Sequence, residues 1–347
     1  MTGRKMVAWY GVNKRNLPWR DTENPYLIWV SEIILQQTRV VQGLDYYCRF
    51  IDAFPDIFSL ARADIDDVLK IWQGLGYYSR ARNMHAAAKH IVEVHRGKFP
   101  ATYDGLIAIK GIGDYTASAV ASLAFGQAVP VIDGNVNRVI SRLYGVQQPV
   151  NKPAGQKEIR VHAEELMVRD DPATYNQAIM EFGALQCVPK NPDCTVCIFR
   201  QVCVAFRSGL VNILPVKVKT AKIATRYFHY LHVCFGNRTY IRQRAAGDIW
   251  TGLYEFPMIE TETETGLDDL SRTLEWQSYF GGQTPVVEAV SQEVTHRLTH
   301  RILKIRFYKI AVNRPVCGKD FIEIPSSEIH RYAVPKVIEN YLYLCPK

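Results

Sequence analysis

Four cysteines within a short stretch constrain this chain more than any other feature. They follow the pattern Cys187-x6-Cys194-x2-Cys197-x5-Cys203. Thiolates spaced so closely can hold a cubane iron–sulfur cluster. Structural zinc sites favour two Cys-x2–4-Cys pairs, and only the two middle cysteines form such a pair here. The pattern therefore favours an iron–sulfur cluster over zinc, held in a loop over residues 187–203.

The charge and hydropathy of the chain limit its partners and its surroundings. Lysine and arginine exceed aspartate and glutamate by 42 to 34, which gives a net charge of +8 and favours a polyanionic partner such as nucleic acid. No run of about 18 apolar residues occurs, and residues 1–15 lack the apolar core of a signal peptide. We therefore expect a cytoplasmic, nucleoid-associated protein that does not enter a membrane.

The chain divides into a helical part and a mixed part. Apolar residues recur at helical spacing over 26–54, 65–72, 81–94 and 116–123, and no clear strand pattern precedes residue 210. The lysine- and valine-rich segment 214–219 resembles a linker. Beyond it, residues 227–235, 239–242 and 302–312 are rich in β-branched and aromatic side chains, which is typical of strands. The acidic, threonine-rich segment 260–265 is interpreted as a solvated loop.

A Gly-x-Gly turn lies between two of the expected helices. Gly111 and Gly113 are flanked by apolar residues at helical spacing, from Leu106 to Val120. Glycine lets a backbone approach a phosphate closely, and the N–H groups that open the second helix can bind it. A simple tight turn is the alternative. The flanking pattern favours a helix–hairpin–helix that binds the DNA backbone.

Two carboxylates complete the set of chemically informative residues. Asp133 lies where a helix is expected to begin, so by itself it suits an N-cap. Glu32 lies within an otherwise apolar helical stretch, where a solvated role is less suitable. Together, two carboxylates suit a reaction through an oxocarbenium-like sugar, in which one protonates the leaving group and the other stabilises positive charge.

Taken together, these features resemble the helix–hairpin–helix DNA glycosylases and, more narrowly, adenine DNA glycosylases of the MutY type. The resemblance covers nearly the whole chain. Its longest strings lie at residues 17–20, 31–38, 74–83, 133–135 and 250–257, beside the hairpin and the cysteines. It implies an all-α glycosylase domain over 1–211 with a [4Fe–4S] loop, a linker over 212–224, and an α+β Nudix-like domain over 225–347 that recognises 8-oxoguanine.

The resemblance implies roles for individual residues. Glu32 would protonate adenine N7, Asp133 would stabilise the oxocarbenium ion, Asn135 would position water or Glu32, and Tyr115 would line the pocket. Other residues would bind the substrate or the DNA backbone. Arg15, Trp19, Arg20, Leu35 and Gln177 would bind the adenine nucleotide; Gln37 and Tyr77 would enter the duplex beside the oxidised guanine; Lys190 would join Gly111 and Gly113 at the backbone.

Three departures from related families refine the expected activity. Endonuclease III-type relatives carry a lysine nucleophile where Tyr115 stands here, so a monofunctional enzyme without a lyase step is expected. In the second domain, the Phe-Ser-His loop of relatives matches Leu298-Thr299-His300, with a leucine in place of the aromatic residue. The Nudix hydrolase signature is missing after Gly252, so phosphohydrolase activity is not expected.

The expected function follows from these points. The chain would act as a monomer on double-stranded DNA and release adenine mispaired with 8-oxoguanine or guanine in base excision repair. Its cofactor would be a [4Fe–4S] cluster, and the resemblance leaves room for a monovalent or divalent cation at the hairpin. The alternatives are an oxidised-pyrimidine glycosylase with lyase activity, which Tyr115 disfavours, and a non-catalytic DNA-binding module, which the paired carboxylates disfavour.

Overall fold

A computed structural model of the chain describes residues 2–218, 224–318 and 320–344. Residues 219–223 of the expected linker and the last three residues of the expected second domain lie outside this described part. By contact, the chain forms two compact units. The first comprises Met1–Arg62 and Asn83–Lys219, and the second comprises Ala63–Arg82 and Thr220–Lys347. The domain boundaries expected at residues 211 and 225 stay predictions, because a contact unit does not define a domain limit.

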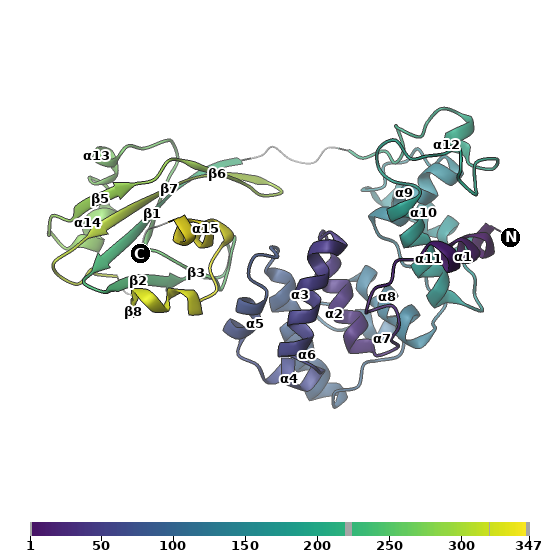
Figure 1. Cartoon of the computed structure of the whole chain (residues 1–347), viewed down its shortest axis with the longest axis horizontal. Helices are drawn as coiled ribbons and strands as arrows, with labels where there is room; N and C mark the ends of the chain where they lie inside the picture. The colour runs from purple at the N-terminus through teal and green to yellow at the C-terminus, as the bar shows by residue number, and fades with distance from the viewer. Residues whose placement is uncertain (1, 219–223, 319, 345–347) are drawn as a thin grey trace. The chain divides into compact units, whose positions relative to one another are not determined.

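The first unit is built from helices (Figure 1). The expected helical periodicity is confirmed, and the long stretch over 26–54 forms two helices. The helices of the described N-terminal part are α1 Thr2–Asn13, α2 Pro25–Leu35, α3 Val40–Ala53, α4 Ile57–Arg62, α5 Ile65–Ile71, α6 Ser79–His95, α7 Tyr103–Ile107, α8 Asp114–Phe125, α9 Gly134–Tyr144, α10 Pro153–Leu166, α11 Pro172–Leu185 and α12 Val204–Arg207. Of these, α5 and the start of α6 belong to the second unit.

Helix α2 is buried on nearly all sides, which explains its almost continuous apolar sequence. Asn24 caps its first turn by accepting a hydrogen bond from the Tyr26 N–H, and Pro25 occupies the first helical position. Trp29 and Val30 are fully buried, and the helix packs on both α3 and α8. A carboxylate on such a helix is therefore forced into the interior of the unit.

The hairpin between α7 and α8 requires glycine at one position. Gly111 has a φ of +98°, and a Cβ there would lie 2.8 Å from the carbonyl oxygen of Asn83. Both the conformation and the space exclude other residues. Gly113 precedes α8 as its N-cap, is exposed, and has no side chain to cap the helix. The N–H groups of the first turn of α8 are thus not capped by a side chain at that position.

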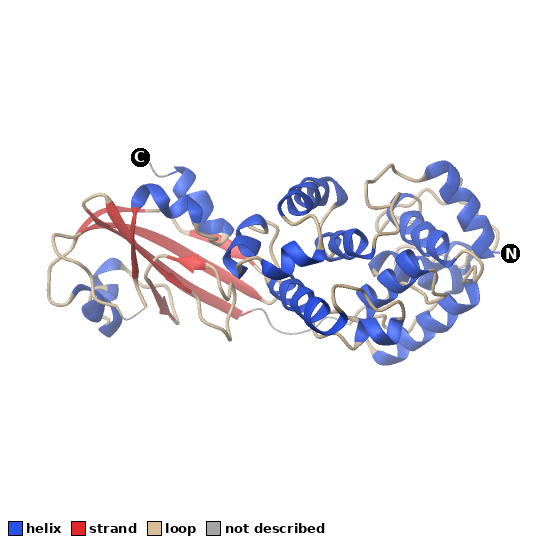
Figure 2. Cartoon of the chain, turned by 90° about the horizontal axis from the view of Figure 1, so that it is seen from below, coloured by secondary structure: helices blue, strands red, loops and turns tan. Residues whose placement is uncertain are grey.

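The second unit contains a mixed sheet of eight strands, shown in red in Figure 2. Its long strands β1 and β7 are parallel and pair over eleven positions, from Ala224↔Arg301 to Cys234↔Ala311. The strand order is β3-β2-β1-β7-β5, with β4 on β1, β6 on β7 and β8 on β2. The strands are β1 Ala224–Phe235, β2 Arg238–Gln243, β3 Tyr254–Glu255, β4 Met258–Thr261, β5 Val286–Val290, β6 Val294–Arg297, β7 Arg301–Ala311 and β8 Ile322–Pro325.

Side chains of β1 alternate between two apolar clusters, one on each face of the sheet. Phe228 and Tyr230 join the cluster covered by α15 (Lys336–Leu344), whereas Leu231 and Val233 join the cluster covered by α14 (Leu274–Phe280). The remaining helical elements are α13 Leu267–Leu270 and the 3-10 helix η1 Ser326–Arg331. The three predicted strands are thus confirmed within one to three residues at each end.

One sequence interpretation is corrected by the structure. The segment 260–265 is not wholly a solvated loop, because Glu260 and Thr261 end β4 and pair with β1. Backbone contacts also connect the end of the described part of the first unit to its helices. Val150 donates a backbone hydrogen bond to the Val216 carbonyl (3.0 Å), and Asn151 binds both backbone groups of Val218. Residues up to 218 therefore belong to the first unit.

Candidate active site

Glu32 lies in the interior of the first unit, where α2 places it. Glu32 is 6 % exposed, and one of its carboxylate oxygens accepts a hydrogen bond from the phenol of Tyr115 on α8. Burial raises the pKa of Glu32 to about 7, the hydrogen bond from Tyr115 opposes this, and the negative charge of Asp133 adds to it. Glu32 is therefore a carboxyl that can give up or accept a proton near neutral pH.

Asp133 is both the N-cap of α9 and a neighbour of this carboxyl. One carboxylate oxygen accepts from the Val136 N–H at 2.7 Å, and the other accepts from the Asn135 side-chain amide at 2.7 Å. Burial raises the pKa of Asp133, while these hydrogen bonds lower it. The sequence left the cap and the chemical role as alternatives, and the structure shows that a cap position also brings the carboxylate toward Glu32.

Tyr115 connects the hairpin with the carboxylates. It occupies the first turn of α8, two residues after Gly113, so the turn that would contact DNA also sets the position of the phenol. Burial and the charge of Glu32 raise the pKa of Tyr115 well above its usual value. The phenol therefore remains protonated and donates to Glu32.

Sequence reasoning missed two residues that hold the Asp133 segment. Buried Asn176 on α11 donates to the Val129 carbonyl (2.9 Å) and accepts from the Val131 N–H (3.0 Å). Arg138 on α9 donates to the Asn135 side-chain oxygen (2.9 Å) and to the Cys187 carbonyl (2.7 Å). These partners lie about 45 residues or more away along the chain in three of the four contacts, so no local pattern reveals them.

Three of the residues expected to form the adenine pocket, Arg15, Arg20 and Gln177, lie around α11. An acidic residue that the sequence did not single out, Glu181, lies among them. Arg15 and Arg20 both donate to Glu181, at 2.5 to 2.9 Å, and Glu181 is 1 % exposed. Burial alone would raise the pKa of Glu181, but the hydrogen bonds from the two arginines outweigh it and lower the pKa to about 2. Gln177 accepts a hydrogen bond from the Tyr10 hydroxyl at 2.5 Å.

The remaining expected pocket residues differ in exposure. Trp19 is 6 % exposed and packs edge-on against Tyr47, with ring centroids 5.1 Å apart, so its ring belongs to the core. Leu35 ends α2 and is partly exposed. The sequence left two alternatives for Trp19, a core position and a place in the adenine pocket. The packing against Tyr47 corresponds to the core position.

Two residues that were expected to contact the opposite base have strained backbones. Gln37 (φ +58°) in the first unit and Tyr77 (φ +48°) in the second are non-glycine residues in the left-handed region, and both are exposed. Such strain is concentrated at functional sites. Within the second unit, the Tyr77 hydroxyl lies 3.0 Å from the Thr299 hydroxyl, and His300 is exposed beside it in sequence.

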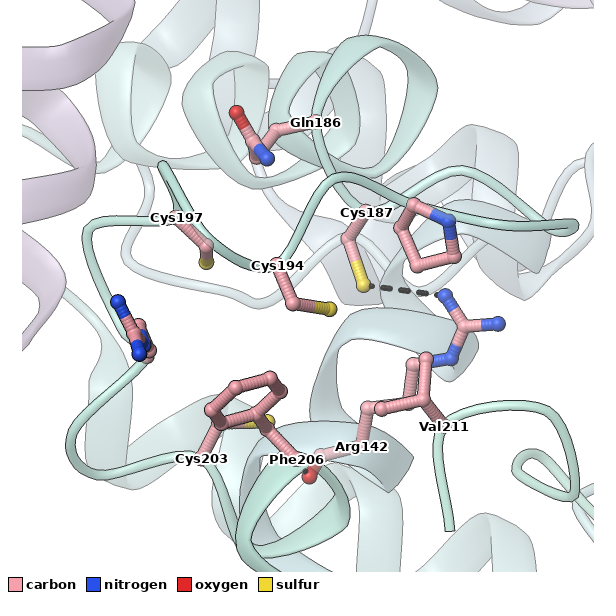
Figure 3. A pocket seen from close by; sticks show the side chains of 10 residues that line it. Arg142, Gln186, Cys187, Cys194, Cys197, Cys203, Phe206 and Val211 are labelled. Carbon is pink, nitrogen blue, oxygen red and sulfur yellow. Dashed lines mark hydrogen bonds between the residues drawn. The ribbon is translucent and has the colours of Figure 1, made fainter. Parts of the chain in front are cut away.

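The four cysteines line one cavity, and Figure 3 shows their side chains gathered around it with Arg142. Buried Arg142 lies 3.4 Å from the Cys187 sulfur and donates to the carbonyls of Val188 (2.7 Å) and Pro189 (3.0 Å). Among the described residues, no three potential ligands converge as a single metal ion requires. Four cysteine thiols around one cavity are the donor set that an iron–sulfur cluster takes.

The folds of both parts match known families. Residues 30–166 match the model described as "HhH-GPD superfamily base excision DNA repair protein", and residues 229–344 match the NUDIX domain. A thermostable thymine-DNA glycosylase is similar in structure over 59 % of this chain and 95 % of its own, with a TM-score of 0.55 and 26 % identity. An endonuclease III–DNA complex covers 60 % of this chain and 95 % of its own, with a TM-score of 0.52; at 18 % identity it supports the fold alone.

The helix–hairpin–helix fold and the buried carboxylates thus define a base-excision DNA glycosylase with an added Nudix-like domain. The curated relatives narrow this class. An adenine DNA glycosylase of Buchnera aphidicola (Schizaphis graminum) is 32 % identical over 97 % of this chain and 96 % of its own length. A human adenine DNA glycosylase is 38 % identical over 57 % of this chain and 38 % of its own. The chain belongs to the adenine DNA glycosylase family.

Both the expected fold class and the expected enzyme class are therefore confirmed: the chain is a DNA-binding glycosylase that removes adenine in base excision repair. No helix among the residues that the structure describes is long and apolar enough to span a membrane.

Proposed function

We propose that this enzyme hydrolyses the N-glycosidic bond of adenine paired with 8-oxoguanine and has no lyase step. The observation that carries the proposal is the geometry at Glu32, a buried carboxyl bonded to Tyr115 and close to the charge of Asp133. Its pKa of about 7 keeps a large fraction protonated at neutral pH, which a general acid requires.

The proposed steps use this chain's own groups. Glu32 donates its proton to N7 of adenine, so that the base leaves as a neutral molecule with the electron pair of the glycosidic bond. The sugar becomes an oxocarbenium ion, and the Asp133 carboxylate stabilises its positive charge. Water then attacks C1′, Glu32 takes up the released proton, and Asn135 holds the Asp133 carboxylate in place. The products are free adenine and an abasic site.

A monofunctional mechanism is supported by Tyr115. A lyase needs an amine that attacks C1′ and forms a Schiff base. The phenol at this position cannot form a Schiff base, and it is already engaged as a donor to Glu32. Water is therefore the nucleophile that we propose.

We propose four residues for contacts with the base opposite adenine. Gln37 and Tyr77 would fill the stack that base flipping opens, and Thr299 and His300 would contact the oxidised guanine. Their support is exposure, the strained backbone of Gln37 and Tyr77, and the contact between the two hydroxyls. Arg15, Trp19, Arg20, Leu35 and Gln177 would surround the flipped adenine.

We further propose that Cys187, Cys194, Cys197 and Cys203 hold a [4Fe–4S] cluster. Bound there, it would crosslink the 187–203 loop and keep exposed Lys190 on a surface that faces DNA. Gly111 and Gly113 would bring backbone N–H groups to a phosphate, where a cation could also be coordinated by backbone carbonyls. A monomer acting on chromosomal DNA in the cytoplasm is the matching assembly and location.

Single-turnover cleavage of a duplex with one adenine opposite 8-oxoguanine tests this function. Release of free adenine, with strand breaks only after hot alkali, is the expected result. Glu32→Gln should retain binding and abolish release. Direct nicking without alkali would exclude the monofunctional mechanism, and nicking at oxidised pyrimidines without adenine release would replace the whole proposal by an endonuclease III-like activity.

A further inference from the structure

By contact, the segment Ala63–Arg82, which we call the docking segment, belongs to the unit that contains the sheet, although it lies between helices of the first unit in sequence. It contains α5 and Tyr77. Its apolar contact with the sheet includes Leu69 and Gly252, where the leucine methyl lies 3.2 Å from the place that a Cβ on Gly252 would occupy. Gly252 also has a φ of +80°, so no larger residue fits there.

Polar contacts hold the docking segment along its length. Lys70 donates to the Tyr332 carbonyl at 3.1 Å and to the Gln73 side chain at 3.0 Å. The Gln73 oxygen in turn accepts from the Val334 N–H at 3.2 Å. At the far end of the segment, Arg82 donates to the Thr251 carbonyl at 2.6 Å.

The one carboxylate among these contacts is Asp66, in the first turn of α5. One of its oxygens accepts from the Tyr254 hydroxyl at 2.6 Å, and the other accepts from the Gln243 amide at 3.1 Å. Tyr254 and Gln243 are paired across β3 and β2, so both donors lie side by side in the sheet. Hydrogen bonds to a charged acceptor are stronger than neutral ones, so Asp66, which accepts two of them, is a strong polar anchor of the segment.

We propose that Asp66 is a positioning residue for recognition of the base opposite adenine. By fixing α5 to Tyr254 and Gln243, it sets the place of Tyr77 relative to Thr299, whose hydroxyl is 3.0 Å away. Burial does not fix the positions of the Tyr77 and Thr299 hydroxyls, because both residues are exposed. Asp66 touches no reacting atom in this scheme. The inference rests on the proposed preference for 8-oxoguanine.

The structure excludes a role for Asp66 in helix capping alone. The N-cap of α5 is Asp64, whose side chain accepts from the Asp66 N–H. The Asp66 side chain points to the sheet instead, and it is half-buried, whereas Asp67 beside it is exposed. Asp67 therefore offers a matched control with the same charge on the same helical turn.

The test compares single-turnover rates of adenine release from duplexes with A:8-oxoguanine and with A:G. We expect D66N and Y254F each to lower the A:8-oxoguanine rate roughly tenfold, which corresponds to the free energy of one charge-assisted hydrogen bond. The A:G rate should stay unchanged, and the D66N/Y254F double variant should be no worse than the single ones. D67N should behave as wild type.

The outcomes separate this inference from the function on which it rests. Equal losses on both duplexes would show a merely structural contact and overturn the inference. Wild-type rates on both duplexes would overturn it as well. Y254F removes a single hydroxyl, so it keeps the test decisive should D66N fold poorly. A wild-type enzyme without preference for 8-oxoguanine would overturn the proposed specificity itself, before any variant is considered.

Discussion

At the scale of single residues, the proposed chemistry depends on a carboxyl group that the fold keeps from water. Glu32 owes its pKa of about 7 mainly to burial, with the charge of Asp133 adding to the effect. The sequence located both carboxylates, because a glutamate within an apolar helix and an aspartate at a helix start are visible locally. It could not locate Glu181 or Asn176, since their partners lie far away along the chain.

Tyr115 tunes this acid. Its hydrogen bond lowers the pKa of Glu32, so Y115F should raise that pKa further. In the proposed mechanism the protonated form is the active acid. The alkaline limb of the single-turnover rate should therefore move to higher pH in the variant, while the wild-type rate should fall as pH rises through about 7. A pH–rate profile from pH 5 to 9 measures the alkaline limb of the wild type and of the variant. An unchanged limb would show that Glu32 is not the titrating group.

Removal of the charge at Glu32 should stabilise the protein at high pH. The folded-state pKa lies above the usual 4.5, so the folded state is favoured fully below that value and loses this advantage as pH rises through about 7. The rise corresponds to about 3 kcal/mol. E32Q should therefore melt later than wild type at pH 8.5 and about equally at pH 4.5, as thermal denaturation would measure. A lower melting temperature of E32Q at pH 8.5 would contradict this.

At the scale of secondary-structure elements, Glu181 ties the chain between α1 and α2 to α11 through Arg15 and Arg20. Its pKa is depressed to about 2, so the stabilisation is present above 4.5 and is lost as pH falls toward 2. E181Q leaves two arginines without their counter-charge and should cost about 3 kcal/mol at neutral pH. Denaturant unfolding at pH 7 measures this, and D170N, at the exposed pair with Arg4, is the control that should change little.

The elements also show where sequence patterns fail. The strands β1 and β7 were predictable, because long β-branched and aromatic runs have few other interpretations. The acidic segment that starts at Glu260 looked solvated, yet Glu260 pairs across β4 and β1 and binds Arg226 at 2.6 Å. Composition reports the charge of a segment, whereas the partner strand decides whether that charge is neutralised. Likewise, nothing in the sequence of 63–82 indicates that this segment packs with the sheet.

At the scale of the whole molecule, the chain combines a conserved type of fold with an excess of positive charge. The net charge of +8 favours binding to DNA phosphates, which releases counterions and makes the affinity fall steeply with salt. The sequence alone predicts this behaviour, because it depends on total charge rather than on any one contact. Which lysines take part depends on the surface that faces DNA, and here the cysteine loop is the strongest candidate.

Lys190 provides the test, because it is exposed on that loop. K190A should weaken binding to all duplexes alike and reduce the slope of log affinity against log salt by about one, as expected for the loss of one phosphate contact. Lys98 is equally exposed but lies in the turn after α6, outside every contact proposed here, so K98A should keep the wild-type slope. Fluorescence anisotropy with undamaged duplex over a range of salt concentrations measures both. Equal slopes for the two variants would mean that the loop contributes only its general charge, and the cysteines would then serve the fold of the domain rather than its contact with DNA.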